Sequence, residues 1–313
     1  MPASRVAGKQ NTLRRSATVT GIGVHSGRTA SLTIHPAEAG SGICFQRANG
    51  HDPVHAHYTN VSATDFCTVV GLNGSSVATI EHLMATLRAL DVDNATIEID
   101  GPEVPVMDGS AGAFLEALDE AGIAALDAPR SMIEVLRPVS VRIGESHAEF
   151  LPYDGARIEI EIDFANPLIG CQKFAADIDS KVFRREIARA RTFGFLADVE
   201  QLWARGLAQG ASLDNAVVIG QDRVMNPEGL RFVDECVRHK ALDAVGDLAL
   251  AGAPIRGLYR SYRGGHKLNV AALAALLSDQ DAWAWSGQTG AGERRETVTG
   301  MARETAVIGP EAA

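Results

Sequence analysis

The pattern of apolar positions predicts one long helix around which the other segments can be arranged. Apolar residues recur three or four positions apart throughout 231–248. The expected core-facing stripe consists of Val233, Val237, Ala241, Ala244, Val245 and Leu248. His239, Asp243 and Asp247 repeat every fourth residue on the side away from this stripe, where Cys236 also projects. A His and an Asp one turn apart can bind one metal ion, so the helix alone leaves a metal site and a buried ion-pair network equally open.

The remaining pattern predicts two successive sets of strands, each accompanied by helices. Short alternating segments, separated by Gly, Asn, Asp and Pro, are typical of mostly antiparallel sheets. In the first half we expect strands at 18–24, 30–35, 43–46, 54–58, 67–71 and 95–100, and helices at 79–90 and 110–121. In the second half we expect strands at 132–143, 147–151, 157–164, 216–219 and 257–263, and helices at 180–190, 196–205 and 269–277. This repeated order predicts an α+β protein of two similar two-layer domains.

The boundaries follow from the same pattern. We expect a first α+β domain over 1–127, beginning with a loose arm to about residue 15, and a linker near 124–130. The second α+β domain covers 128–287, with an inserted βαβ-like segment near 195–220. Residues 288–313 lack an apolar period and are expected to form a disordered tail.

Composition excludes several classes of function. An apolar content of 46% with 22% charged residues is typical of a soluble globular protein. A net charge of −10 disfavours nucleic acid as a partner, although a local cluster of Lys and Arg can still bind a small anion. The four cysteines show no Cys-x-x-Cys spacing, which fits a reducing compartment. We find no signal peptide and no apolar run long enough to span a bilayer, so we expect a cytoplasmic protein.

Glu81 and His82 lie at the start of the predicted first helix. If Thr79 caps this helix, the helix dipole favours an ionised Glu81. Taken alone, His82 is better interpreted as a surface residue, because it points away from the apolar stripe of its own helix. If the second domain covers this face, His82 joins His239 and Asp243 in a two-His, one-carboxylate set, which is a catalytic zinc arrangement with Glu81 as a neighbouring base. The spacing is not the His-Glu-x-x-His signature and does not establish a metal by itself.

Two further segments offer chemistry. His266 follows two glycines between a predicted strand and a predicted helix, and is either an ordinary surface His or an acid oriented by Asp247. Thr192 and Phe193 place a hydroxyl and an aromatic ring just before the insertion. This is a weak signal, because a loop Thr is usually only a turn former.

Seven motifs occur in order between about residue 11 and about residue 278. They are GIGVHSG at 21–27, TIEHL at 79–83, EVPVMDGS at 103–110, ARTFGF at 190–195, EGLRF at 228–232, VRHKALD at 237–243 and GHKLN at 265–269. As a set they resemble the UDP-3-O-acyl-N-acetylglucosamine deacetylases, the zinc amidases that commit a pathway to lipid A. No single motif is specific, and the tail from 288 lies outside the resemblance.

The resemblance implies an architecture and a set of roles. The two domains would pack with their helices facing, with the active site in the cleft between them and one catalytic zinc per chain. The implied metal ligands are His82, His239 and Asp243. The implied catalytic residues are Glu81 as general base, His266 as acid or charge stabiliser, Asp247 orienting His266, and Thr192 at the oxyanion. The implied substrate-binding residues are Phe193, Lys240, His25, Cys67, Leu202 and Ile219, the last two in a hydrophobic passage for the acyl chain.

The function so implied is hydrolysis of the N-acetyl group of an acylated UDP-N-acetylglucosamine, which gives acetate and the free amine. A zinc amidohydrolase of the same fold that acts on another N-acyl substrate is the alternative. A binding protein without catalysis is disfavoured, because the ligands, Glu81 and His266 are all present. We expect a monomer. The sequence leaves open zinc versus iron, the acyl-chain length, and whether His266 or Glu81 protonates the leaving amine.

Overall fold

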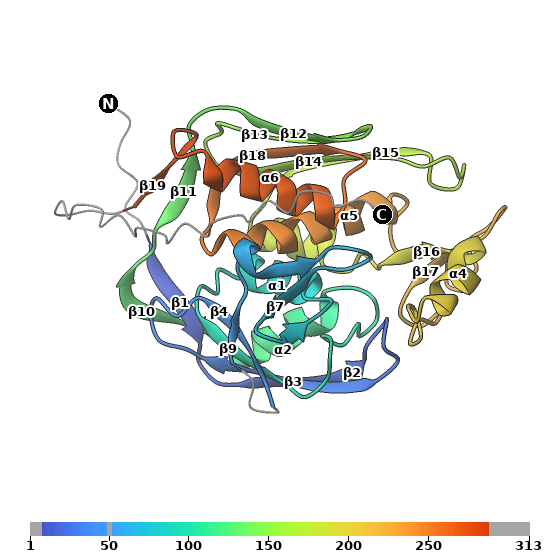
Figure 1. Ribbon diagram of the computed structural model, residues 1–313, viewed down its shortest axis with the longest axis horizontal. Coiled ribbons are helices and arrows are strands. Elements are labelled where there is room, and N and C mark those ends of the chain that lie inside the picture. Colours follow the sequence, from blue (N-terminus) through green and yellow to red (C-terminus); the bar gives the residue numbers. More distant parts are fainter. Residues whose placement is uncertain (1–7, 49–51, 288–313) are drawn as a thin grey trace, which may run out of the picture.

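The computed structural model describes residues 8–48 and 52–287, in which two main sheets enclose a layer of helices (Figure 1). The expected α+β class is confirmed. The predicted disorder of 288–313 concerns residues outside the described ranges, and the division at 127/128 stays a prediction. Within the described residues, every helix is too short or too polar to cross a membrane.

The first sheet has five strands in the order β2-β3-β9-β4-β5. Their bounds are β2 Ala17–Ile22, β3 Thr29–Pro36, β9 Ala95–Ile99, β4 Ile43–Arg47 and β5 Val54–His55. The pairs are antiparallel except β4 with β9, which is parallel. Helices α1 (Glu81–Ala89) and α2 (Gly112–Ala121) cover its inner face (Figure 1).

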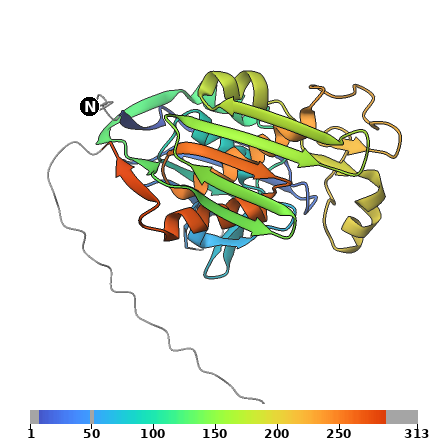
Figure 2. The ribbon, with the colours of Figure 1, turned by 90° about the horizontal axis from the view of Figure 1, so that it is seen from above.

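The second sheet repeats this order. Around the long strand β18, the strands run β12-β13-β18-β14-β15, and β14 with β18 is again the parallel pair. Their bounds are β12 Val139–Ile143, β13 Ser146–Leu151, β18 Ile255–Tyr262, β14 Ala156–Asp163 and β15 Cys171–Asp177. Strands β11 (Met132–Val135) and β19 (Trp283–Ser286) extend the sheet from the first residues of β18. Figure 2 shows these strands from above, with helices α5 (Glu235–Leu248) and α6 (His266–Ser278) beneath them.

Alternation of side chains explains why each sheet has one buried face. Ile158, Ile160 and Ile162 of β14 are buried, while the residues between them are partly exposed. Ala30, Leu32 and Ile34 repeat the pattern in β3. The apolar faces of the two sheets point towards the helices, so the helical layer is buried from both sides.

Each half carries an insertion immediately before its central helix. Before α1, strands β6 (Val61–Ala63), β7 (Val69–Leu72) and β8 (Ser75–Val77) form a small antiparallel sheet. Before α5, strands β16 (Phe193–Phe195) and β17 (Val217–Ile219) pair in parallel, with α4 (Val199–Ala204) between them. The short connecting helices are Tyr58–Asn60, α3 Ser180–Val182, a π-helical turn Phe183–Ile187, Leu196–Asp198 and Ala249–Ala251.

Several predicted elements were wrong. The expected loose arm contains strand β1 (Lys9–Leu13), and it pairs with β10 (Ile123–Pro129), which was predicted as a linker. Strands β15 and β19 were not predicted, and the single strand expected over 132–143 is two strands, β11 and β12. Strands β1 and β15 are largely polar and β19 has four residues, so their backbone pairing leaves little apolar pattern in the sequence.

The central helix also differs from its prediction. It begins at Glu235, so Val233 lies outside it and is 91% exposed instead of belonging to the core stripe. The face that carries His239, Asp243 and Asp247 is buried as well, because α1 and α6 pack against it.

Candidate active site

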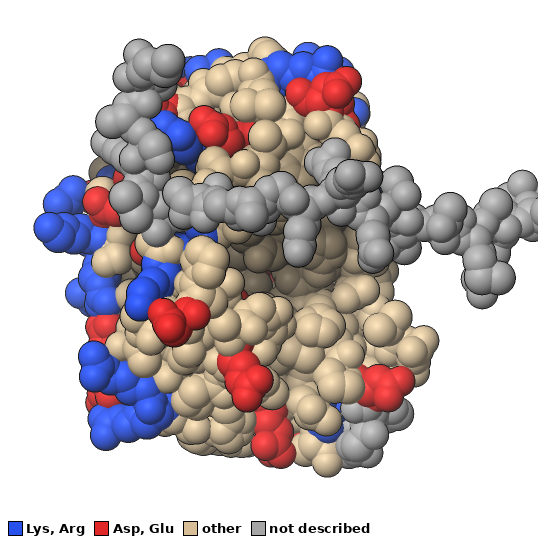
Figure 3. Space-filling model, turned by 90° about the vertical axis from the view of Figure 1, so that its left-hand side faces the viewer, with Lys and Arg blue, Asp and Glu red and all other residues tan. Residues whose placement is uncertain are grey.

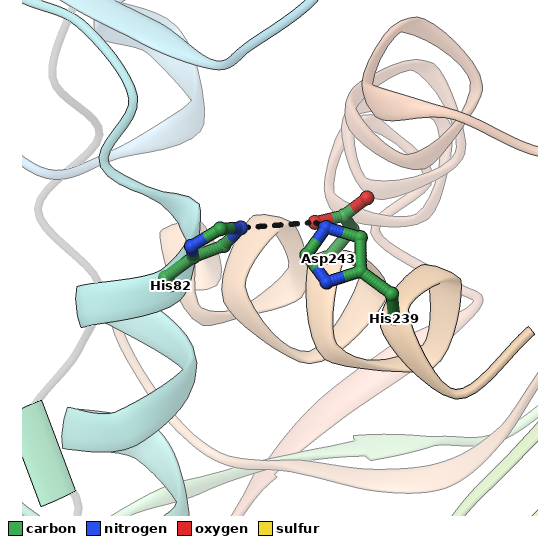
Figure 4. A group of neighbouring side chains, drawn as sticks. All are labelled: His82, His239 and Asp243. Carbon is green, nitrogen blue, oxygen red and sulfur yellow. Dashed lines mark ion pairs between the residues drawn. The ribbon is translucent and has the colours of Figure 1, made fainter. Parts of the chain in front are cut away.

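The contact between α1 and α5 brings together three side chains from the two halves that could bind a metal ion (Figure 4). His82 is the second residue of α1, and His239 and Asp243 lie one turn apart on α5. Their ligand atoms all lie within 4.8 Å of one another, and each side chain is at least 95% buried. The two helices approach closely at Gly246, where any Cβ atom would collide with the carbonyl oxygen of Glu81.

One unpaired atom of this group fits a metal ion. Oδ1 of Asp243 is buried without a hydrogen-bond partner, although it lies 3.7 Å from Nε2 of His82 and 3.4 Å from Nε2 of His239. These distances are too long for good hydrogen bonds. They are close to the roughly 3.4 Å edge of a tetrahedral site with ligand bonds of about 2.1 Å.

Neighbouring groups set the orientation and the protonation state of these three side chains as a metal site requires. Nδ1 of His239 contacts the carbonyl oxygen of Ala190 at 3.0 Å, which directs Nε2 towards Asp243. Burial lowers the pKa of His82 to about 3, so its imidazole is neutral. Burial alone would raise the pKa of Asp243, but the cation of Lys240 above all, with protonated His266, holds it well below its usual range. Asp243 is therefore ionised, with its Oδ2 paired to Nζ of Lys240 at 2.8 Å.

A carboxylate and an imidazole stand beside this group. Oε1 of Glu81 lies 3.9 Å from Nε2 of His266, and Oδ2 of Asp247 lies 2.9 Å from Nδ1 of the same imidazole. Burial raises the pKa of Glu81 to about 7. Burial opposes protonation of His266, but the carboxylates of Asp247 and Glu81 outweigh it and raise the pKa to about 9. The arrangement thus holds a base and a protonated acid near neutral pH.

Comparison with known proteins identifies the family. The family model described as UDP-3-O-acyl N-acetylglycosamine deacetylase matches residues 10–278. A protein of Brucella ovis named UDP-3-O-acyl-N-acetylglucosamine deacetylase is 55% identical over 277 residues, which are 88% of this chain and 97% of the relative. Proteins of the same name from Brucella abortus strain S19, at 55%, and Brucella melitensis, at 54%, have the same coverage. The chain belongs to the UDP-3-O-acyl-N-acetylglucosamine deacetylase family. The members of this family are metalloenzymes.

The structure also places the other residues that the family resemblance indicated. Phe193 stands edge-on to His239, with ring centroids 6.4 Å apart, and Nζ of Lys240 lies 5.8 Å from the Phe193 ring centroid. Thr192 is two residues beyond Ala190, the partner of His239, and its backbone N–H donates to the carbonyl oxygen of Gly109 at 2.8 Å. Phe193 and Lys240 therefore border the metal group.

His25 and Cys67 belong to the first half of the chain. The backbone N–H groups of His25 and Ser26 donate to the buried carboxylate of Glu103, which also accepts from the Thr79 hydroxyl at 2.9 Å. Thr79 has a positive φ of 58° and α1 has no side-chain cap, so the condition that Thr79 caps this helix is not met. Burial and the charge of Glu81 raise the pKa of Cys67 to about 12, which keeps it a thiol.

The insertion before α5 presents two kinds of apolar side chain. Ile219 is 2% exposed and packs in the core, whereas Leu202 is half-buried. Leu196, Trp203 and Leu213 are 41–55% exposed. The surface of the insertion is thus more apolar than its short elements can bury.

Three groups that sequence reasoning missed hold the site together. Glu103 begins the EVPVMDGS motif, and its carboxylate accepts hydrogen bonds from His25, Ser26 and Thr79. Arg191 and Glu235 form an ion pair 2.9 Å long, at 2% and 1% exposure, which fastens the start of β16 to the start of α5. Thr68 lies in the core between Glu81 and Asp247. The sequence pattern did not predict these contacts, because the residues that make each contact are distant along the chain.

A cavity of about 910 Å³ lies elsewhere, at the far ends of α1 and α5 on the side of the molecule shown in Figure 3. Arginines in its lining are paired with carboxylates, as in Arg88 with Asp91 at 2.5 Å and Arg256 with Glu134 at 3.1 Å. Its described lining includes none of the three metal-ligating residues. We therefore place the chemistry at the metal group.

Proposed function

We propose that this chain is a zinc-dependent deacetylase that hydrolyses the N-acetyl group of UDP-3-O-acyl-N-acetylglucosamine, with acetate and UDP-3-O-acyl-glucosamine as products. The observation that carries the proposal is the buried, unpartnered Oδ1 of Asp243 facing His82 and His239. Two nitrogen ligands and one carboxylate suit zinc and leave a fourth position open. The shared name of the Brucella relatives supports the substrate.

The zinc ion would be held by His82, His239 and Asp243, and would supply Lewis-acid chemistry that acidifies a water and polarises the acetamide carbonyl. Glu81 takes a proton from the attacking water. A bond forms between the water oxygen and the carbonyl carbon, and the amide C–N bond breaks. Thr192 donates a hydrogen bond to the oxyanion that develops on the carbonyl oxygen.

His266 delivers the proton that the leaving amine requires, and Asp247 holds its imidazole through Nδ1. A raised pKa of about 9 supports this role, since His266 is then protonated at neutral pH. Phe193, Lys240, His25 and Cys67 surround the sugar-binding region, and Leu202 with its neighbours on the insertion contacts the acyl chain. The monomeric state and cytoplasmic location expected from the sequence stay predictions.

The direct test is acetate release from the acylated UDP-sugar by zinc-loaded protein. We expect stoichiometric acetate and free amine, and loss of both when a chelator removes the metal. Absence of acetate from zinc-loaded protein, with release from a different N-acyl sugar, would overturn the substrate assignment.

A further inference from the structure

We propose that Thr68 is a positioning residue that joins the base Glu81 to the Asp247–His266 pair. Thr68 lies just before β7 in the small sheet of the first half and is 0% exposed. Its backbone N–H donates to Oε2 of Glu81 at 3.0 Å, and its hydroxyl donates to Oδ1 of Asp247 at 2.5 Å. This inference rests on the function proposed above and adds a residue to it.

These contacts close a ring of four residues. Thr68 bonds to Glu81 and to Asp247, Asp247 bonds to His266, and His266 faces Glu81 at 3.9 Å. The two members that move protons, Glu81 and His266, come from different halves of the chain. Thr68 is the link through which the position of one is tied to the position of the other.

The hydroxyl of Thr68 has a specific task at Asp247. The Asp247 carboxylate is 0% exposed, so its oxygens need donors from the protein. Oδ2 accepts from Asn269 at 2.8 Å and contacts Nδ1 of His266, whereas the hydrogen bond found for Oδ1 is the one from Thr68. Without the hydrogen bond from Thr68, we expect the Asp247 carboxylate to rotate towards another donor. The imidazole of His266, which it holds, would then lose its position facing Glu81.

The backbone of Thr68 fixes the start of α1 at the same time. Its carbonyl oxygen accepts from the N–H of Ile80 at 3.4 Å, one residue before Glu81. Thr68 therefore contacts both the backbone that leads into α1 and the carboxylate of its first residue. A side-chain change at 68 leaves these backbone bonds in place, so it isolates the link to Asp247.

The test compares Thr68→Val, which keeps the shape and removes the hydroxyl, with Thr68→Ser, which keeps the hydroxyl. On the acylated UDP-sugar we expect Thr68→Val to lower kcat by about 10- to 100-fold, with KM and zinc content near wild type. Thr68→Ser should recover kcat to within about threefold. A structural role would instead lower activity in both variants in step with their melting temperatures.

Equal kcat in the valine and serine variants would overturn the proposal. If Thr68→Val yields no folded protein, Thr68→Ala takes its place, and wild-type kcat in that variant would overturn the proposal equally. Wild-type enzyme that releases no acetate contradicts the proposed function instead, so the two failures are distinguishable.

Discussion

The two insertions occupy equivalent places in the two halves but are attached to the rest of the molecule by different interactions. The first, β6–β8, is joined to the site by neutral donors, through the N–H and hydroxyl of Thr68. The second, β16–β17, is joined to α5 by the buried ion pair of Arg191 with Glu235. The two insertions also contact each other. The guanidinium of Arg205, in the second insertion, lies 5.1 Å from the ring centroid of Phe66, in the first. The two halves share a strand order and differ in the insertion that precedes the central helix of each.

The same division holds for the central helices. The first half supplies Glu81 and one of the three candidate metal ligands, and the second half supplies the other two and His266. Neither half alone contains a complete site. The chemistry therefore depends on how closely α1 and α5 pack, which the absence of a side chain at Gly246 permits.

The largest effect is expected at the base in the first half. Glu81→Gln should lower kcat by about 10²- to 10⁴-fold, because the amide cannot accept the proton. Zinc content should stay at one per chain, since Glu81 is not among the proposed metal ligands. Glu116→Gln, an exposed change on α2, is the matched control for rate and metal content. Near-normal kcat in Glu81→Gln would refute its role.

The insertion of the second half is tested next, through the acyl chain. If the chain is buried there at roughly 0.8 kcal/mol per methylene, removing it from the substrate should lower kcat/KM by orders of magnitude. The variant Leu202→Ser with Trp203→Ser should reduce this preference, whereas Leu136→Ser with Trp285→Ser, an exposed Leu and Trp at the β11–β19 edge of the second sheet, should not. Ile219 is left unchanged because a polar residue there would disrupt the core.

Full retention of the acyl preference in the double variant would make the insertion structural. Equal hydrolysis of the acylated and non-acylated sugars by wild type would contradict the account of the insertion altogether.

The free energy of unfolding tests the buried ion pair that joins the second insertion to α5. Glu235→Ala leaves the buried Arg191 without its main partner and should lower the free energy of unfolding by about 3–5 kcal/mol. Asp127→Asn, which removes the exposed pair of Lys9 with Asp127, should cause no measurable change. Denaturant titration of both variants measures the difference. A fall of similar size in the two would show that the buried pair has no special role.

The smallest expected change is a shift in pH dependence. The kcat/KM profile should rise as Glu81 loses its proton at about 7 and fall as His266 loses its proton at about 9. The Asp247 carboxylate raises the pKa of His266, so Asp247→Asn should move the alkaline limb to lower pH. We would measure the profile of both proteins after confirming equal zinc content. An unmoved alkaline limb would remove His266 from the role of acid.

The sequence predicted the helices and the ladder on α5, because a regular spacing of His239, Asp243 and Asp247 persists in one element. It could not place His82 against them without the family resemblance, because that contact joins residues more than 150 positions apart and depends on packing between halves. The polar strand β1 was missed for a related reason: its pairing with β10 uses backbone groups, which no side-chain pattern reports. Thr68 was not predicted, because a single Thr forms no periodic pattern in the sequence.

The central claim is that one metal is held jointly by the two halves, and metal stoichiometry tests it most directly. Purified wild-type protein should contain one zinc per chain. His82→Ala, in the first half, and His239→Ala, in the second, should each lose the metal and the activity together, while Glu81→Gln keeps the metal. Full zinc occupancy in either His variant would contradict a site shared between α1 and α5.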